Sequence, residues 1–480
     1  MPAKIPFLNA SASLQDKWRD STSPHRVNAQ IYVFVLLITI GLLRHFLFPP
    51  NKIPKFNGTF GSISPSSEPG AKDETVGKVQ EIFIYPIKSC AGLSVDKADL
   101  TSQGFDLDRR WMIIKSTGSK QKFGKIEKIS LREEPRLTFI QPVIEEHSNR
   151  LVLKLTAVGE QEEKRKGRNV LVETETVLRP TADELRAWNS VPGIEMYGDF
   201  ADGRVAGLPS GSMRKPSPSE WISDFLGYPV LLIHFDTISF TVRNAFPIFK
   251  PPSDSTAWSD SDRQELHRKR GIEFQDEYPL LVASVASLNF VRNQLATAVS
   301  STDGSDGRGG RAITGIDAGK WNSVEALSMA RFRPNIVVKG EFGPFSEDSW
   351  ERMWILPAEN EKQLVEIENP EAMLQLVARC QRCLLTAVDP ITADKDPSVP
   401  LKLLNRSRMR VKKVQGISDG NGRAGPCFGM YAIPLPLSRN EECQDANYGR
   451  FKLGDQIKVR WRPFDLDDEP ERLRSSQTDT

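Results

Sequence analysis

Cysteine and histidine are scarce in this chain of 480 residues, which contains five of each. A small and odd number of cysteines does not form a disulfide framework, and it fits a reducing compartment. One CxxC is present, formed by Cys380 and Cys383, and no second one accompanies it. A zinc site would have to gather its ligands from distant loops, and a redox dithiol would open a helix, whereas this pair precedes a strand-like segment. Both kinds of site are therefore disfavoured.

An excess of charge of either sign is absent as well. The chain has 64 Lys and Arg against 62 Asp and Glu, a net charge of +2, so no basic field indicates a nucleic-acid partner. No Walker or Rossmann pattern occurs, and the glycine-rich residues 301–310 (STDGSDGRGG) predict a disordered surface loop rather than a phosphate-binding one. The composition is that of a globular protein with more than one domain.

Long apolar runs are limited to one, residues 31–48 (IYVFVLLITIGLLRHFLF). At about 1.5 Å per residue, a helix of this length just crosses a hydrocarbon core, and Arg44 near its end can reach the lipid interface. We expect a transmembrane anchor at residues 29–48, after a polar segment at residues 1–28. A secretory signal peptide is the alternative, although the preceding polar segment is long for one. Basic residues are balanced across the run and set no orientation.

The rest of the chain divides into a linker, two folded parts and a tail. Residues 49–76 are rich in Pro, Gly, Ser and Asn, which predicts a flexible linker. Short apolar segments then recur between turn-forming stretches, as is typical of small barrels or sandwiches. The prediction is an α+β fold that is mostly β, with one domain at residues 77–235, a second at residues 236–462 and a mobile tail at residues 463–480.

Individual elements follow from the same patterns. One helix begins after Ser217, which forms a capping box with Glu220, and ends at Gly227. Ser284 can cap a second helix. Strands are predicted at residues 79–85, 110–115, 136–140, 150–155, 228–235, 332–339, 383–388, 429–433 and 456–461.

The pair Arg382-Cys383 carries the most chemical information. A thiolate binds soft transition metals, while an adjacent guanidinium lowers the pKa of a thiol and offers two parallel donors to a phosphate. Such a pair suits a metal held by an anionic organic cofactor. Taken alone, the pattern also fits two small buried hydrophobic residues, Cys380 and Cys383.

Several short motifs occur in order along the chain: IYPIKS at 84–89, DRRW at 108–111, REEPRL at 132–137, FRPNIV at 332–337, EDSW at 347–350, RCLLTAVDP at 382–390 and FGMY at 428–431. Together they resemble the MOSC-domain molybdenum enzymes, in particular the mitochondrial amidoxime-reducing components. The resemblance extends over residues 77–461. The ordered set is more specific than any one motif, and it favours a functional Cys383 over a buried hydrophobic residue.

The resemblance implies an N-terminal MOSC-type β-barrel domain packed on a C-terminal MOSC β-barrel domain, with a molybdenum-molybdopterin cofactor (Moco) at their junction. It implies that Cys383 is the protein ligand of molybdenum. Positions that contact the pterin or its phosphate in the family correspond to Lys88, Ser89, Arg109, Arg333, Asn335, Gln381, Arg382 and Tyr431. This is physically sensible because a buried phosphate needs several charge-assisted donors to offset its desolvation. Each Arg or Lys taken singly also fits a surface charge or an interdomain salt bridge.

The function that the resemblance implies is a membrane-anchored reductase of N-hydroxylated compounds such as amidoximes. Electrons would come from NADH through cytochrome b5 reductase and cytochrome b5, at the mitochondrial outer membrane with the catalytic body facing the cytosol. Asp276 and Asp389 are candidate proton donors by proximity in sequence, and each also fits a turn or capping role. The alternatives are a cofactor or sulfur carrier related to the C-terminal domains of molybdenum-cofactor sulfurases, and a tethered scaffold that has lost the cofactor.

One segment departs from the family pattern. Where related proteins carry a pair of hydroxyl residues before a proline, this chain has Glu277 and Tyr278. A carboxylate beside a phosphate would repel it unless the side chain points away. We therefore expect the backbone of this segment, and not its side chains, to form part of the pocket wall.

Overall fold

The computed structural model of the chain describes residues 73–115, 126, 128–168, 173–196, 199–212, 216–239, 243, 271–300, 313–358, 370–412, 424–439 and 446–461. The predicted polar segment, anchor, glycine-rich loop and tail lie outside the described residues, as does the predicted linker up to residue 72. None of the helices in the described part is long and apolar enough to span a bilayer.

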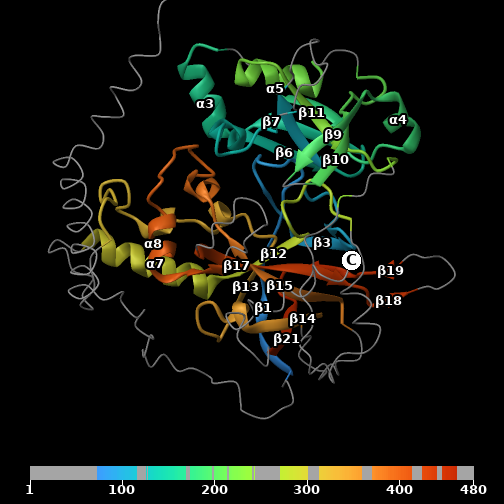
Figure 1. The fold of residues 1–480 in the computed structure, drawn as a ribbon. Helices are drawn as coiled ribbons and strands as arrows, with labels where there is room; N and C mark the ends of the chain where they lie inside the picture. Colours follow the sequence, from blue (N-terminus) through green and yellow to red (C-terminus); the bar gives the residue numbers. More distant parts are fainter. Residues whose placement is uncertain are drawn as a thin grey trace, which may run out of the picture. The chain divides into compact units, whose positions relative to one another are not determined.

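The largest sheet closes into a barrel of seven strands (Figure 1). The strands follow one another in the order β12, β13, β1, β21, β14, β15 and β17, and a further pairing of β17 with β12 closes the ring. Their bounds are β1 Asp73–Ile84, β12 Leu280–Ser284, β13 Ile336–Gly340, β14 Trp350–Leu356, β15 Ala372–Gln381, β17 Ala424–Leu435 and β21 Gln456–Trp461. Two short strands extend the ladder, β2 (Leu93–Ser94) beside β1 and β16 (Met409–Lys412) beside β17.

The barrel is stabilised by apolar side chains that recur at every second residue. Ile336 and Val338 of β13, and likewise Leu374 and Leu376 of β15, are fully buried in one apolar cluster. Burial of each such side chain contributes about 1.5–3 kcal/mol. This alternation is the pattern from which the strands were predicted, and the predicted strands at residues 150–155 and 456–461 match β7 and β21 residue for residue.

β1 links the first part of the chain to the barrel of the second. It pairs with β13 on one side and β21 on the other, so a strand that begins the predicted N-terminal domain is a barrel strand. The last four residues of the predicted linker, 73–76, already belong to β1. Gly77 is required where β1 passes β13, because a Cβ there would lie 2.3 Å from the backbone oxygen of Lys339.

The N-terminal part consists of smaller curled sheets in the described residues. One sheet has the order β5, β11, β10, β9, and another has the order β6, β7, β8. Their bounds are β5 Trp111–Lys115, β6 Ile140–Glu145, β7 Arg150–Leu155, β8 Glu173–Val177, β9 Ser190–Met196, β10 Asp199–Val205 and β11 Val230–Phe235. Short strands elsewhere in the described residues form two small sheets, one of β20, β3 and β4 and one of β18 and β19. Their bounds are β3 Lys97–Thr101, β4 Gly104–Phe105, β18 Ser438–Arg439, β19 Ala446–Asn447 and β20 Arg450–Lys452. The predicted class, mostly β with some helices, is confirmed.

The α-helices flank these sheets and have the bounds α3 Ala157–Arg165, α4 Ala182–Ala187, α5 Pro218–Leu226, α7 Val285–Ser300 and α8 Leu401–Ser407. The capping box predicted for α5 is present, since Ser217 and Glu220 bond reciprocally and Gly227 ends the helix with φ +80°. The predicted cap of α7 is present too, because the Ser284 hydroxyl accepts a hydrogen bond from the backbone N of Ser287 at 3.1 Å.

Two predicted strands are wrong, because the structure has 3-10 helices there. The segment at residues 136–140 is largely η1 (Pro135–Phe139), which the Glu134 side chain caps. The segment at residues 383–388 contains η5 (Leu384–Ala387), in which the backbone N of Thr386 donates to the carbonyl oxygen of Cys383 at 3.1 Å. Apolar alternation predicted extended chain in both cases, but local hydrogen bonds close turns instead.

Glu347 of η4 (Ser346–Ser349) is a fully buried carboxyl group at the start of α7. Its carboxyl oxygens accept hydrogen bonds from the hydroxyls of Ser284 at 3.0 Å and Ser287 at 2.6 Å. Burial, with a smaller contribution from Asp348, raises the pKa of Glu347 from 4.5 to about 7. The folded state thus binds the proton of Glu347 more tightly than the unfolded chain does. The contribution of this group to the free energy of unfolding is therefore fully present below pH 4.5 and is lost as the pH rises through about 7.

We expect Glu347→Gln, which mimics the protonated acid, to flatten the pH dependence of the free energy of unfolding between pH 4.5 and 7.5. The wild type should lose up to about 3 kcal/mol over this interval from this group, and the variant should not. Urea denaturation at several pH values measures the difference. Glu160→Gln on the exposed face of α3 controls for the loss of one acid. Parallel pH profiles for wild type and Glu347→Gln would contradict the assignment.

Candidate functional site

Cys383 lies at a bend between β15, which ends at Gln381, and η5. Its side chain is exposed, in contrast to the other described cysteines, Cys90, Cys380 and Cys427. It lines a cleft of about 350 Å³ together with Arg132, Arg382, Leu384, Leu401, Asn405 and Pro426. No group of three or more His, Cys, Asp or Glu in the described part of the chain forms a metal site from protein ligands alone. An accessible thiol of this kind suits a metal that brings its other ligands with it.

The guanidinium of Arg382 is buried beside this bend. Its Nη1 donates to the Sγ of Cys380 at 2.8 Å, and its Nη2 donates to the carbonyl oxygen of Phe332 at 2.8 Å. Its Nε is buried and has no hydrogen-bond partner in the described residues. Burial raises the pKa of the Cys380 thiol. Cys380 is therefore the buried small residue of the CxxC, and Cys383 is the accessible one.

Arg331 holds the segment that carries Cys383 against η3 (Met329–Phe332). Its side chain is buried, its Nη1 donates to the carbonyl oxygen of Ala387 at 3.3 Å, and its Nη2 donates to the Asp389 carboxylate at 2.5 Å. Both acceptors lie in the segment that follows Cys383, with Ala387 at the end of η5 and Asp389 two residues after it. Arg331 is thus placed to fix the position of the thiol without touching it.

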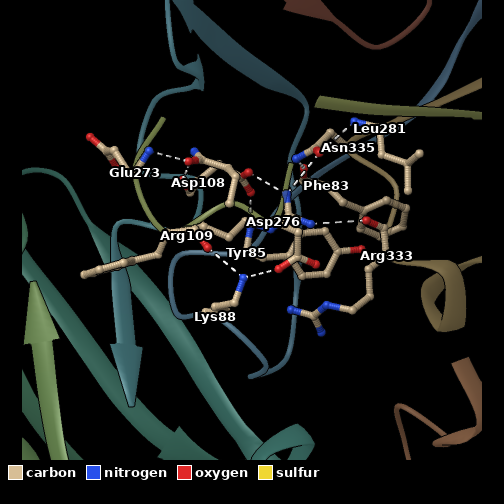
Figure 2. Close-up of polar contacts among 12 residues, drawn as sticks. Phe83, Tyr85, Lys88, Asp108, Arg109, Glu273, Asp276, Leu281, Arg333 and Asn335 are labelled. Carbon is tan, nitrogen blue, oxygen red and sulfur yellow. Dashed lines mark hydrogen bonds and ion pairs between the residues drawn. The ribbon is translucent and has the colours of Figure 1, made fainter. Parts of the chain in front are cut away.

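A second part of the site is built around Tyr85 (Figure 2). The ring is buried, and two guanidinium groups lie over it, with the Cζ of Arg109 at 4.4 Å and the Cζ of Arg333 at 4.2 Å from the ring centroid. Burial raises the pKa of the phenol to about 12, and the hydroxyl has no hydrogen-bond partner in the described residues. The ring interacts with both cations through its face, and because it is neutral it supplies no counter-charge to them.

Arg109 bridges the first part of the chain and the barrel. Its Nη1 donates to the Asp108 carboxylate at 2.5 Å and to the side-chain oxygen of Asn335 at 3.0 Å. Asp108 also accepts a hydrogen bond from the backbone N of Tyr85 at 2.8 Å. Asn335 accepts a second one from the backbone N of Leu281 in β12 at 3.2 Å. The structure thus brings together two of the predicted cofactor contacts, Arg109 and Asn335.

In the described residues, the guanidinium of Arg333 makes one hydrogen bond, from its Nη1 to the carbonyl oxygen of Cys90 at 2.8 Å. Its buried Nη2 has no partner there. Burial lowers the pKa of this guanidinium to about 10. Arg333, Arg109 and Ser89 all have left-handed backbone, with φ of +52°, +54° and +71°. Such strain in non-glycine residues costs about 1–3 kcal/mol each and clusters at functional sites.

Lys88 and Asp276 form an ion pair in the same region (Figure 2). The Lys88 amine also donates to the carbonyl oxygen of Phe274 at 2.7 Å. Burial lowers the pKa of Lys88 to about 8, and the Asp276 carboxylate opposes this shift. The Asp276 side chain is 45% exposed, whereas that of Lys88 is 12% exposed. The pair therefore places a half-exposed acid against a largely buried cation.

The remaining predicted contacts lie on β15 and β17. The Gln381 side chain lies over Gly425, where a Cβ would come within 2.4 Å of its Nε2. The ring of Tyr431 packs 5.1 Å from that of Tyr278, so the tyrosine that replaces the family hydroxyl has a packing role. Burial, and then Asp276, raise the pKa of Glu277. A raised pKa favours the neutral acid, which does not repel a phosphate.

Asp389 has both carboxylate oxygens engaged. Oδ1 accepts hydrogen bonds from the backbone N atoms of Ile391 at 2.8 Å and Thr392 at 3.0 Å, and Oδ2 binds Arg331. These contacts are those of the turn-forming role considered from the sequence. A role of Asp389 in proton transfer stays a prediction.

The donor set fits an anionic cofactor. Among the buried donors that lack a partner in the described residues, three belong to the residues of this site: the Arg333 Nη2, the Arg382 Nε and the Tyr85 hydroxyl. Unpaired buried donors cost about 1–3 kcal/mol each, and a phosphate or pterin oxygen would satisfy them. Arg382 connects these donors to the thiol, because its hydrogen bond to Phe332 lies next to Arg333 in the chain. Moco therefore suits the residues present.

Three residues with clear structural roles were not singled out from the sequence. Tyr85 and Asp108 lie inside motifs that carry the resemblance, and their roles required the positions of Arg109 and Arg333. Arg331 immediately precedes such a motif, and only its burial distinguishes it from a surface arginine. For Arg331, the signal would have been a basic residue expected to be buried.

Comparison with known protein families agrees with this architecture. Residues 76–191 match the MOSC N-terminal beta barrel domain, and residues 269–458 match the MOSC domain. The chain belongs to the MOSC-domain proteins, a family whose domains bind molybdopterin cofactor. The predicted family is confirmed.

Individual relatives have low sequence identity to this chain, but the similarity extends over most of its length. Mitochondrial amidoxime-reducing component 1 of Mus musculus is 28% identical over 363 residues, which covers 75% of this chain and 78% of that protein. The protein of the same name from Homo sapiens is 26% identical over 394 residues, covering 80% and 83%. Molybdenum cofactor sulfurase of Danio rerio is 24% identical over 347 residues, covering 71% of this chain and 32% of the sulfurase.

The position of Arg331 predicts that Arg331→Gln loosens the segment after Cys383. Removing one partner of a buried ion pair typically costs about 3–5 kcal/mol, and we expect a loss in this range in urea denaturation. Hydrogen exchange under native conditions should accelerate at the backbone N of Thr386 and Val388. Arg186→Gln, which removes an exposed arginine of α4, is the control. Unchanged exchange in this segment would show that Arg331 does not hold it.

Proposed function

We propose that this chain is a Moco-dependent reductase of N-hydroxylated compounds. The observation that carries the proposal is the accessible thiol of Cys383 beside buried cationic donors that lack partners. The similarity to amidoxime-reducing components over most of the chain supports the choice of substrate class.

In this proposal, the Cys383 thiolate is the protein ligand of molybdenum. Phosphate and pterin oxygens are held by Arg109, Arg333, Arg382 and Lys88, and Ser89, Asn335, Gln381 and Tyr431 complete the contacts. When bound, the cofactor supplies two-electron redox chemistry, which no amino-acid side chain provides. The protein positions the group, compensates its charge and limits access to it.

Protons must reach the substrate when its N–O bond breaks. We propose Asp276 as the source of these protons, passed on through water because Asp276 does not line the cleft beside Cys383. Its side chain is half-exposed and can exchange protons with solvent. Its partner Lys88, with a pKa lowered to about 8, stays mostly protonated at pH 7 and keeps the Asp276 carboxylate in place. Asp389 is the second candidate, with its oxygens engaged as described above.

The electron source in this proposal is NADH, through cytochrome b5 reductase and cytochrome b5. The predicted anchor would keep the catalytic body beside membrane-bound donors, which raises their effective concentration. The relatives that are named mitochondrial favour a mitochondrial location. The outer membrane, with the body facing the cytosol, is the arrangement that we propose.

Reduction of benzamidoxime with NADH, cytochrome b5 and its reductase tests the proposal. We expect benzamidine to form only when all components and the molybdenum-loaded chain are present. Binding of the cofactor without turnover would favour the carrier of cofactor or sulfur, for which the similarity to molybdenum cofactor sulfurase is the specific support. Absence of cofactor after expression with ample molybdenum would favour a scaffold.

Replacing the proposed ligand should remove the metal. We expect Cys383→Ala to retain less than about one tenth of the molybdenum found in wild type, because a thiolate ligand is lost from a metal that the cationic residues hold only through its cofactor. Elemental analysis of the purified proteins measures this. Cys427→Ala, a buried cysteine that does not line the cleft, is the matched control. Equal metal content in all three proteins would exclude the ligand.

Arg333→Gln should weaken cofactor retention while leaving the thiol in place. Loss of a charge-assisted hydrogen bond costs about 1.5–3 kcal/mol, which corresponds to about a 10- to 150-fold weaker affinity. Cofactor release during dialysis, followed by pterin fluorescence, gives the ratio. Arg333→Lys keeps the charge and should lose less. Retention as in wild type in Arg333→Gln would mean that the unpaired Nη2 does not face the cofactor.

A further inference from the structure

The cleft beside Cys383 has walls of two kinds. Leu384, Leu401 and Pro426 are apolar, and Leu384 is 53% exposed, which is unusual for a leucine next to a proposed reaction centre. Arg132 and Asn405 provide polar groups, and the described part of the chain contributes no Asp or Glu to the lining of the cleft. Apolar walls with a few fixed polar groups are typical of a small-molecule site.

Arg132 is the cation that faces this cleft without a role in the cofactor contacts. The other arginine in its lining, Arg382, uses both of its terminal nitrogens on Cys380 and Phe332. The backbone of Arg132 is anchored, because its carbonyl oxygen accepts a hydrogen bond from the Lys395 amine at 2.5 Å. The preceding residue, Leu131, is buried.

The acidic neighbours of Arg132 are engaged elsewhere. The Glu133 carboxylate accepts a hydrogen bond from the backbone N of Ser130 at 3.2 Å, and Glu134 binds Arg136 at 2.7 Å. Neither of them lines the cleft. The cleft therefore combines apolar walls with a positive potential at the thiol.

We propose that this cleft is the substrate site and that Arg132 selects against positive charge. The preferred substrates are N-hydroxylated compounds with an apolar body that are neutral or anionic. The inference rests on the proposed function for the chemistry, but the charge of the cleft can be measured without it.

The same charge acts on the product. Reduction of an amidoxime takes up two electrons from cytochrome b5 and two protons, breaks the N–O bond, forms an N–H bond and releases water. The resulting amidine takes up a further proton at neutral pH and becomes a cation. Arg132 thus repels the product but not the neutral substrate, and it favours product release.

The first test measures the potential at Cys383 directly. The full chain, produced without molybdenum, is alkylated in parallel with iodoacetate, an anion, and iodoacetamide, which is neutral. The rate at Cys383 is followed by mass spectrometry of the peptide that contains it. Both reagents attack the same thiolate, so the ratio of their rates reports local charge and not the pKa of the thiol.

We expect the iodoacetate to iodoacetamide ratio to fall about threefold in Arg132→Gln and to stay near the wild-type value in Arg132→Lys, because one nearby partly screened charge contributes an effect of this order. Arg186→Gln, which removes another exposed arginine that does not line the cleft, should leave the ratio unchanged. An equal ratio in wild type and Arg132→Gln, or no alkylation of Cys383 by either reagent, would overturn the inference.

The second test uses the molybdenum-loaded chain. Benzamidoximes with a carboxylate or a trimethylammonium group in the para position differ in charge at similar size. We expect the KM of the cationic substrate to exceed that of the anionic one by about tenfold in wild type, and this difference to shrink in Arg132→Gln. If both substrates turn over and their KM ratio is the same in wild type and Arg132→Gln, the role of Arg132 is refuted and the proposed function stands. Failure of both substrates to turn over, with a normal alkylation ratio, would refute the proposed function and leave the charge of the cleft established.

Discussion

The burial of several cations with few counter-charges is the constraint on which this site depends. Arg109, Arg333 and Lys88 lie close to one another, and Asp108 and Asp276 are the carboxylates paired with them. Burying a charge costs several kcal/mol unless it is paired and hydrogen-bonded. The lowered pKa values of Arg333 and Lys88 express this cost, because desolvation is their largest cause. A fold that maintains such an arrangement is organised around an anion that would relieve it.

The barrel makes this arrangement possible. β1 brings the loop with Tyr85 and Lys88 to β13, and Asn335 at the start of β13 binds Arg109, which lies 226 residues away in the chain. Left-handed backbone occurs at Arg333, which follows η3, and at Arg109, which lies in the turn before β5. The site is therefore assembled from segment ends that the ladder holds fixed, and the strain is borne by the sheet.

The regular elements could be predicted from the sequence because each depends on local rules. α5 has its cap, its first-turn proline and its terminal glycine; β7 is a short apolar segment between turns, and β21 alternates apolar and polar residues. The segment after Cys383 also alternates, yet it forms η5, since a buried arginine and local turns decide its path. Arg109, Arg333 and Tyr85 all lie within motifs, but the motif does not predict the role of Tyr85, because that role arises only where two distant guanidinium groups meet.

The arginines of the site form two groups that differ in burial. Arg109, Arg333 and Arg382 are buried and tied to backbone or side-chain acceptors, so they suit a group that binds once and stays. Arg132 lies on the exposed side of Cys383, where ligands exchange. A buried cation holds an anion with little screening, while an exposed one acts through a weaker and salt-dependent field. Under the proposed assignments, retention of a cofactor and selection among substrates could be changed independently, because different arginines at different depths would carry them.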